Sequence, residues 1–411
     1  MRVVVTGMGA IAPNGNNVSE YWDALTTGQS GIDHITYFDT TDFPVKIAGE
    51  VSNFDPEQYF ERKEVRKLDP FSVYALVASN EAIQMSGLDA GGFDPQRAGV
   101  MLGCGIGGIT TLLAEHVVLQ NRGARRISPF FVTKLISNIA GGQIAIKWDL
   151  RGPNQTVTSA CASATDAIGL ALRLIQSGSA DIMVAGGTEA TICDLPLAGF
   201  STIRALCNAA DPPQSASRPF DKDRGGFVMG EGAGILVLET EKHAQSRGAT
   251  IIGELAGYGS TNDAFHVTQP AEGGAGAVKA MQLAIEDAGA EPEEVDYINA
   301  HGTSTPYNDK NETAAIKTVF GDHARKLKIS STKSMTGHLL GASGGIEAIA
   351  ALKTIEKQTI PPTINYTTPD PDCDLDYVPN TAEETQVNSV LSNTFGFGGH
   401  NAVVFMRKWQ D

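Results

Sequence analysis

The chain has 411 residues and a formal net charge of -16 at pH 7. This charge disfavours nucleic acids and anionic membranes as main partners, because both are polyanions. No apolar run reaches about 18 residues, so we expect no membrane span. The N-terminal segment carries one positive charge and a glycine-broken apolar run, which indicates a first strand and not a signal peptide.

Short apolar or β-branched runs alternate with helical patterns along the chain. This alternation predicts an α/β fold with covered sheets. The expected strands are Val3–Thr6, Gly99–Leu102, Gln155–Ser159, Ile182–Ala185, Gly234–Glu239, Tyr297–Ala300 and Leu327–Ser331. The expected helices are Val73–Met85, Ala162–Gln176, Ala277–Ala288 and Ile346–Glu356.

Two parts of the chain repeat the same order of predicted elements. The segments that begin at Glu81 and at Leu283 each contain a helix, a glycine stop, an acidic spacer with proline and a strand. A second pair of segments, around Cys161 and around Lys333, each contain a strand, a loop and a helix. Two pairs in the same order predict a duplicated α/β half. We expect an N-terminal half over residues 1–250 and a C-terminal half over residues 251–411.

Two glycine motifs partly fit a dinucleotide-binding loop. The motif from Gly7 to Ala12 is followed by a Pro-Asn-Gly turn, where a nucleotide site needs a helix. The motif from Gly103 to Gly108 opens a helical pattern but lacks the acidic strand end expected about 20 residues later. Both motifs therefore favour close backbone packing over a nucleotide site.

The five cysteines are widely spaced and form no CxxC pair. This argues against a disulfide framework and against a zinc site. Reduced thiols in the cytoplasm fit best. The cysteines are Cys104, Cys161, Cys193, Cys207 and Cys373.

Cys161 lies in the stretch VTSACASATDA, between a predicted strand and a predicted helix. This layout is typical of a nucleophile elbow. The helix N-terminus would favour the thiolate and lower the thiol pKa, and its free N–H groups can form an oxyanion hole. Free cysteines are also common as inert core residues, so the elbow alone leaves both interpretations open.

Two histidines favour the catalytic interpretation. His301 follows a predicted strand, and His338 lies at another strand-loop-helix corner. Sites in α/β folds form where strand ends of this kind meet. The wide separations along the chain match no metal-binding spacing. A thiol together with two imidazoles indicates covalent acyl chemistry.

Four motifs stand in a fixed order along the chain: SACAS, NAHGTSTP, SSTKSMTGHLLGASG and NTFGFGGHN. They resemble the motifs of the β-ketoacyl-acyl-carrier-protein synthases, specifically the elongating type II enzymes. The resemblance covers nearly the whole chain. It implies the thiolase fold, a five-layer αβαβα sandwich of two similar halves, which agrees with the internal repeat.

The resemblance implies a decarboxylative Claisen condensation of fatty acid biosynthesis. Cys161 would take the acyl group from acyl-carrier protein as a thioester. Malonyl-carrier protein would then lose CO2, and its carbanion would attack the thioester to give 3-oxoacyl-carrier protein. His301 and His338 would donate hydrogen bonds to the malonyl thioester oxygen and stabilise the enolate. We expect no metal or cofactor, because the departing CO2 leaves the carbanion directly.

The resemblance also assigns roles to residues around this triad. Lys333 would act electrostatically as a further catalytic residue and pair with Glu347, since a buried lysine needs a partner. Thr303 and Thr305 would bind the phosphopantetheine arm, and Phe397 would gate the site and supply an oxyanion N–H. Further pocket residues are Phe395, Ile106, Phe200 and Phe131, of which the last would reach across a dimer interface.

The implied partners are an acidic acyl-carrier protein and a second copy of this chain. An acidic partner would be repelled by a net charge of -16 unless a local basic patch attracts it. The candidate docking residues are Lys63, Arg66, Lys67, Arg125, Arg126 and Arg204.

Several other assignments are weighed against this one. A type I synthase or a polyketide ketosynthase shares the motifs. A non-condensing partner of the chain-length-factor kind typically lacks the nucleophile, so Cys161 argues against it. Initiating type III synthases use Cys-His-Asn, so His338 argues against them. A Cys–His hydrolase would not require the GHLLGASG loop.

Overall fold

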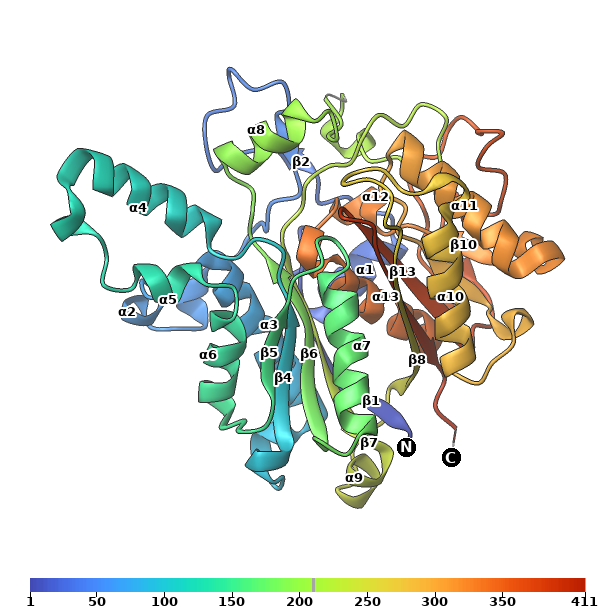
Figure 1. Ribbon diagram of the computed structural model, residues 1–411, viewed down its shortest axis with the longest axis horizontal. Coiled ribbons are helices and arrows are strands. Elements are labelled where there is room, and N and C mark those ends of the chain that lie inside the picture. Colours follow the sequence, from blue (N-terminus) through green and yellow to red (C-terminus); the bar gives the residue numbers. More distant parts are fainter. Residues whose placement is uncertain (209–210, 411) are drawn as a thin grey trace.

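The computed structural model describes residues 1–208 and 211–410 and contains a sheet of ten strands with helices on both sides (Figure 1). Across the sheet the strands follow the order β10-β9-β13-β14-β8-β1-β7-β6-β4-β5. Their bounds are β1 Val3–Ile11, β4 Ala98–Gly103, β5 Asn154–Val157, β6 Ile182–Glu189, β7 Gly232–Thr240, β8 Gly253–Asn262, β9 Tyr297–Asn299, β10 Lys328–Ser330, β13 Ser389–Gly396 and β14 His400–Arg407. Two short sheets pair β2 (Asp33–His34) with β3 (Ile47–Ala48) and β11 (Thr359–Ile360) with β12 (Glu383–Glu384).

The ten strands form two units of five with the same pattern of pairing. In the first unit β4 is parallel to β5 and β6, and β7 is antiparallel to β6 and β1. In the second unit β9 is parallel to β10 and β13, and β14 is antiparallel to β13 and β8. The units join where Val4 and Val5 of β1 pair with Glu254 and Gly253 of β8. The second unit therefore repeats the strand order of the first.

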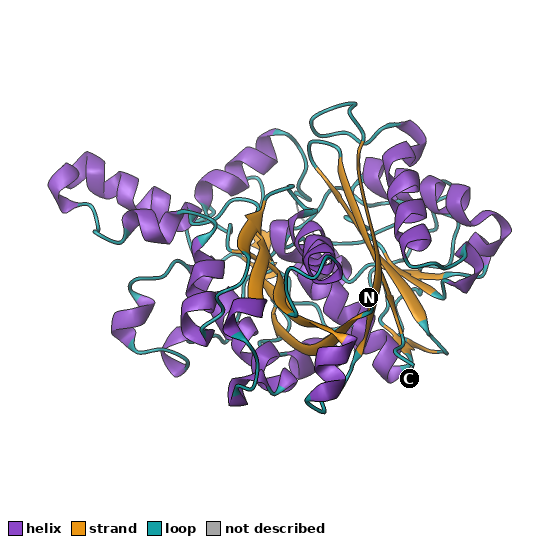
Figure 2. Cartoon of the chain, turned by 60° about the horizontal axis from the view of Figure 1, so that its bottom comes forward, coloured by secondary structure: helices purple, strands orange, loops and turns teal. Residues whose placement is uncertain are grey.

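Helices cover the outer faces of both units and lie between them (Figure 2). α3 (Pro70–Ser86) and α6 (Ile139–Trp148) pack on the first unit, and α10 (Ala275–Asp287) packs on the second. α7 (Ser163–Gln176) and α13 (Ser343–Lys357) each contact strands of both units. The other helices are α1 Val18–Thr26, α2 Arg62–Val65, α4 Ile109–Arg122, α5 Phe131–Leu135, α8 Asp194–Thr202, α9 Glu241–Ser246, α11 Pro306–Phe320 and α12 Lys333–Thr336.

The two central helices, α7 and α13, pack closely against each other. Helices in contact with sheets on two sides need apolar or small residues around most of their circumference, and α13 is buried at all but three of its positions. A Cβ at Gly344 of α13 would lie 2.0 Å from the hydroxyl oxygen of Thr165 in α7. This contact fixes the first turn of α7, next to Cys161, against the first turn of α13.

The seven predicted strands and four predicted helices all occur, with shifted bounds. The largest shift is in β1, which continues to Ile11 and places the first glycine motif inside a strand. A Cβ at Gly9 would lie 1.9 Å from the carbonyl oxygen of Ala78 in α3, so this motif serves close strand-helix packing. Among the described residues, no helix is both long enough and apolar enough to cross a membrane.

Candidate active site

Cys161 lies in a sharp turn between β5 and α7. Ala160, the residue before it, has a φ of +52°, in the left-handed region that side chains other than glycine seldom adopt. The N–H of Ser159 donates to Ser163 Oγ (2.9 Å), and Ser159 Oγ donates to Asp166, so both ends of the turn are fixed. The turn presents the cysteine at the start of α7, in the layout predicted for a nucleophile elbow.

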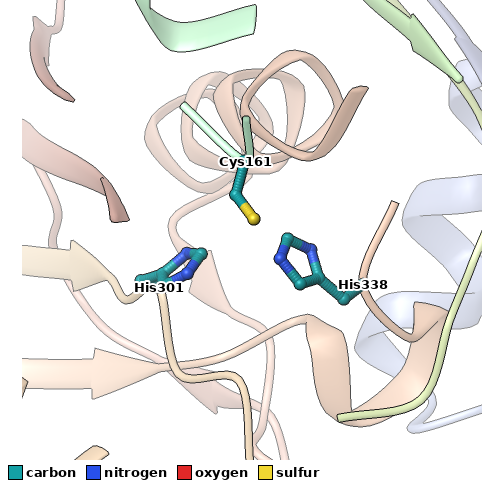
Figure 3. Close-up of side chains that lie close together, drawn as sticks. All are labelled: Cys161, His301 and His338. Carbon is teal, nitrogen blue, oxygen red and sulfur yellow. The ribbon is translucent and has the colours of Figure 1, made fainter. Parts of the chain in front are cut away.

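The two histidines come from the second unit of the sheet. His301 follows β9, and His338 follows α12, the short helix after β10. Each has only 2% of its surface exposed. Both rings face the sulfur of Cys161 (Figure 3), and the sulfur and the two ring nitrogens lie within 4.8 Å of one another. The structure therefore brings together the three residues that the sequence places far apart.

His338 is held as the tautomer with its proton on Nε2. Its Nδ1 accepts a hydrogen bond from the N–H of Leu340 (3.3 Å) and lies 2.8 Å from Ser343 Oγ. In a neutral imidazole the accepting nitrogen carries no proton, so the proton is on Nε2. That atom is buried and has no hydrogen-bond partner among the described residues. It can therefore donate to a substrate oxygen.

The three side chains also form a set of donor atoms that could hold a metal ion. A thiolate and two imidazoles suit Zn2+. The spacing along the sequence gave no sign of this, because each residue follows a different strand. A protonated Nε2 of His338 fits a hydrogen-bond donor better than a metal ligand, so we interpret the group as an acyl-transfer site.

Burial sets the protonation states of the triad. It raises the pKa of the Cys161 thiol to about 11, although Lys333 and the N–H of Phe397 act in the opposite direction. Burial, and then the charge of Lys333, lower the pKa of His301 and of His338 well below the usual value. Both rings are therefore neutral at pH 7. The predicted lowering of the thiol pKa is wrong, because loss of solvation outweighs Lys333 and the nearby backbone N–H groups.

The loop of His301 is anchored by Glu312 of α11. The N–H groups of His301 and Gly302 each donate to the Glu312 carboxylate at 2.8 Å. The amide of Asn393 in β13 donates to the same carboxylate at 3.2 Å. Burial raises the pKa of Glu312 to about 7. This carboxylate therefore holds the His301 loop against the neighbouring strand.

Lys333 and Glu347 form a buried ion pair beside the triad. Lys333 Nζ bonds to Glu347 Oε1, and the two side chains are 2% and 1% exposed. Burial raises the pKa of Glu347, while the charge of Lys333 lowers it. The predicted pair is thus formed, and the catalytic role of Lys333 stays a prediction.

We predict that Lys333→Met lowers the free energy of unfolding by about 3–5 kcal/mol, because it leaves the Glu347 carboxylate buried and unpaired. The double variant Lys333→Met/Glu347→Gln should recover part of this loss. Urea unfolding followed by circular dichroism measures both. Lys310→Met is the matched control, since its ion pair with Asp372 is exposed and should cost less than about 1 kcal/mol. Equal losses in Lys333→Met and the control would contradict the buried pair.

The triad opens onto a cavity of about 430 Å³. The hydroxyls of Thr303 and Thr305, the predicted arm-binding residues, lie 2.9 Å apart. The backbone N–H of Phe397 lowers the pKa of the Cys161 thiol, so it acts on the sulfur near the point where an oxyanion donor is needed. The predicted residues that line the cavity are Thr303, Thr305, Phe397, Phe395, Ile106, Phe200 and Arg204.

The other predicted residues lie elsewhere. Phe131 is not among the residues that line the cavity; it lies in α5, which projects with α4 from the body of the molecule (Figure 1). Lys67 places its ammonium 5.7 Å from the ring of Phe130, so the segment after α2 contacts this projection. The exposed docking candidates outside the cavity are Lys63, Arg66, Lys67, Arg125 and Arg126.

Sequence reasoning missed several residues of this site. Glu189, at the end of β6, and Phe227, whose ring lies 5.3 Å from that of His338, both line the cavity. Glu312 holds the His301 loop. An acidic residue at the end of a buried strand was the available signal for Glu189. Nothing in the local sequence around Phe227 marks it.

Two family models match most of the chain. The model described as "Beta-ketoacyl synthase, N-terminal domain" matches residues 1–244, and the model described as "Beta-ketoacyl synthase, C-terminal domain" matches residues 252–367. The 3-oxoacyl-[acyl-carrier-protein] synthase 2 of Staphylococcus aureus (strain MRSA252) is 51% identical over 410 residues. That alignment covers 100% of this chain and 99% of the relative.

Solved structures agree with this match. A type II PKS ketosynthase in complex with its acyl-carrier protein has a TM-score of 0.92 and 37% identity, and covers 100% of this chain and 99% of that one. The ishigamide ketosynthase/chain length factor has a TM-score of 0.92 and 38% identity, and also covers 100% of this chain and 99% of that one. The fold is thus a mixed α/β, thiolase-like ketosynthase fold with two domains. The chain belongs to the beta-ketoacyl synthase family of condensing acyltransferases.

Proposed function

We propose that this enzyme elongates acyl chains on acyl-carrier protein in fatty acid synthesis, with Cys161 as nucleophile and His301 and His338 as hydrogen-bond donors. The observation that carries the proposal is the position of the Cys161 sulfur, which faces two neutral imidazoles in the wall of a cavity. The 51% identity to a 3-oxoacyl-[acyl-carrier-protein] synthase, against 37% to a polyketide ketosynthase, supports a fatty acid role over a polyketide role.

The first half-reaction transfers an acyl group to Cys161. The sulfur attacks the carbonyl carbon of acyl-carrier protein, and the bond from that carbon to the pantetheine sulfur breaks. The thiol proton of Cys161 ends on the departing pantetheine thiol. The N–H groups of Cys161 and Phe397, which both lower the pKa of the thiol, would stabilise the oxyanion of the intermediate.

The second half-reaction forms the new carbon–carbon bond. Malonyl-carrier protein loses CO2, and the electron pair of the broken bond forms an enolate. Nε2–H of His338, together with His301, stabilises charge on the thioester oxygen. The enolate carbon attacks the acyl-Cys161 carbonyl, and the sulfur leaves and regains a proton from water. The product is a 3-oxoacyl chain two carbons longer.

A two-substrate assay tests this function. Purified enzyme, incubated with acyl-carrier protein and malonyl-carrier protein, should release CO2 and form 3-oxoacyl-carrier protein in equal amounts. Mass spectrometry of the carrier protein measures the product. A control without the acyl substrate should show only slow loss of CO2. Absence of any two-carbon product with acyl groups of several lengths would contradict the proposal.

An acidic carrier protein needs a positive surface near the cavity. Arg204 lines the cavity and is exposed, while Arg66 and Lys67 are exposed after α2. A related ketosynthase has been solved with its acyl-carrier protein. These observations support docking at Arg66, Lys67 and Arg204, with Lys63, Arg125 and Arg126 as additional candidates.

We predict that Arg66→Glu/Lys67→Glu raises KM for acyl-carrier protein about 10-fold and leaves kcat unchanged, because charge reversal weakens encounter and not chemistry. Steady-state kinetics at two salt concentrations measures this, and the difference from wild type should shrink at high salt. Lys242→Glu in α9, also exposed, is the control and should leave KM unchanged. Equal KM values in the double variant and the wild type would contradict docking at this patch.

A second copy of the chain completes the proposed assembly. β5 lies at the edge of the ten-stranded sheet, with unpaired backbone groups of the kind that bind another strand. The neighbouring helices α4, α5 and α6 expose apolar side chains, among them Val117 (57%), Val132 (59%) and Ile146 (77%). Sedimentation equilibrium should give twice the chain mass of 43.3 kDa, and a monomer at micromolar concentration would contradict the dimer.

We also propose how the layers and halves of the fold are arranged. Helices on the two outer faces and between the two sheet units support a five-layer αβαβα sandwich. The repeated strand order supports two similar halves, over residues 1–250 and 251–411. Cys104, Cys161, Cys193 and Cys373 are free thiols, which supports a reducing compartment and hence a cytoplasmic enzyme.

A further inference from the structure

Glu189 is a buried carboxylate for which the mechanism above gives no role. It ends β6, has 0% of its surface exposed and lies at the wall of the cavity that holds Cys161. Its Oε2 accepts hydrogen bonds from the N–H groups of Gly105 (2.8 Å) and Gly341 (3.1 Å). Its Oε1 accepts one from the N–H of Ile106 (3.1 Å) and one from the thiol of Cys104 (3.7 Å). One side chain thus binds the backbone of two separate loops.

Both loops carry proposed functional residues. The loop after β4 contains Ile106, which lines the cavity, and the loop of Gly341 follows His338 directly. The loops touch where both have glycine: a Cβ at Gly341 would lie 2.4 Å from the backbone nitrogen of Gly105 and 2.5 Å from Glu189 Oε2. Only residues without a side chain let both backbones reach the carboxylate. The contact between the two loops therefore depends on Glu189, Gly105 and Gly341, which come from three separate segments of the chain.

We propose that Glu189 is a positioning residue that couples the acyl pocket at Ile106 to the hydrogen-bond donor at His338. This inference rests on the proposed function, because it assigns the two loops to the two half-reactions. The carboxylate fixes the position of Ile106, in the wall against which the acyl chain would lie. Through Gly341 it also fixes the loop that orients the imidazole of His338. The length of acyl chain accepted and the rate of decarboxylation then depend on the same three backbone hydrogen bonds, from Gly105, Ile106 and Gly341.

The charge of Glu189 gives a second, independent readout. Its carboxylate adds to the rise in the pKa of the Cys161 thiol, while Lys333 opposes that rise. A neutral side chain of the same shape removes this contribution. The reaction of Cys161 with iodoacetamide should then begin at lower pH than in the wild type. A residue that served only to fill space would not shift this profile.

Glu189→Gln tests the proposal, because an amide keeps the volume but accepts with only one of its two terminal atoms. Acylation of Cys161 is measured by intact mass with acyl-carrier proteins of several lengths, and decarboxylation by release of CO2 from malonyl-carrier protein. We expect the preference among chain lengths to flatten and decarboxylation to fall about 10- to 100-fold, since both loops lose their fixed position. The alkylation profile should move to lower pH.

Two further variants keep the test decisive. Gly341→Ala pushes the same loops apart from the other side, so it should reproduce the flattened chain-length preference even if Glu189→Gln does not fold. Glu239→Gln is the matched control: it is another buried glutamate, near the end of β7, and is held by Arg247. It should lose stability while keeping the chain-length preference and the alkylation profile.

The outcomes separate this inference from the proposed function. If the wild type forms no acyl-Cys161, the proposed function fails. If the wild type is acylated, and a folded Glu189→Gln or Gly341→Ala protein keeps the wild-type preference and decarboxylation rate, the coupling by Glu189 is overturned.

Discussion

Replacing Cys161 with alanine should lower chain elongation by more than about 10⁴-fold while leaving decarboxylation of malonyl-carrier protein measurable. Elongation needs a covalent bond to the sulfur, and alanine cannot form one. Decarboxylation needs only a donor to the thioester oxygen, and His301 and His338 remain in place. Product analysis by mass spectrometry and release of CO2 measure the two reactions separately.

Cys193→Ala is the matched control for this prediction. Cys193 is also free and half-buried, but it lies before α8 and not among the residues that line the catalytic cavity. This variant should elongate acyl chains at the wild-type rate and still gain the mass of one acyl group. Elongation by the Cys161→Ala protein would remove the nucleophile from the mechanism.

His301→Ala and His338→Ala should each lower the rate of decarboxylation by about 10²–10³-fold, the usual loss when one oxyanion donor is removed. The clearest background is Cys161→Ala, because no condensation then competes for the malonyl substrate. His34→Ala, an exposed histidine of β2, should leave the rate unchanged. Unchanged decarboxylation in both catalytic variants would contradict the role of the imidazoles.

The same histidines predict how the reaction depends on pH. Their pKa values lie well below 6.5, so the neutral rings persist as the pH falls from 8 to 6. Decarboxylation in the Cys161→Ala protein should therefore stay constant over that range. A fall in rate near pH 6.5 would show that a histidine with an ordinary pKa controls the step.

The parts of the fold with strong local patterns could be predicted from the sequence. α7 and α13 have clear helical patterns, and the buried strands β4 and β6 consist mostly of apolar and small residues. β8, β13 and β14 were missed. GELAGYGSTN and SVLSNTFG contain Gly and Asn residues, which have low strand propensity, whereas the apolar run in HNAVVFMR was an available signal for β14. Their pairing with neighbouring strands, which a local pattern does not reveal, makes them strands.

The features of the candidate site also divide into those that a local sequence pattern predicts and those that it does not. Cys161, His301 and His338 could be found because each follows a predicted strand in a loop of small residues. The protonation of the site could not, because the pKa of Cys161 depends on burial by residues from both sheet units. Glu189 and Glu312 bind backbone N–H groups of distant loops, and no spacing along the chain encodes such contacts.

The repeated strand order has a consequence for how activity arises during synthesis of the chain. Cys161 follows β5 of the first unit, and His301 and His338 follow β9 and β10 of the second. The ribosome therefore completes the nucleophile long before the donors exist. The thiol meets the imidazoles only when α13 packs on α7 and β8 pairs with β1. Activity by this mechanism therefore requires that the two sheet units have docked, and a chain that stops after the first unit lacks both imidazole donors.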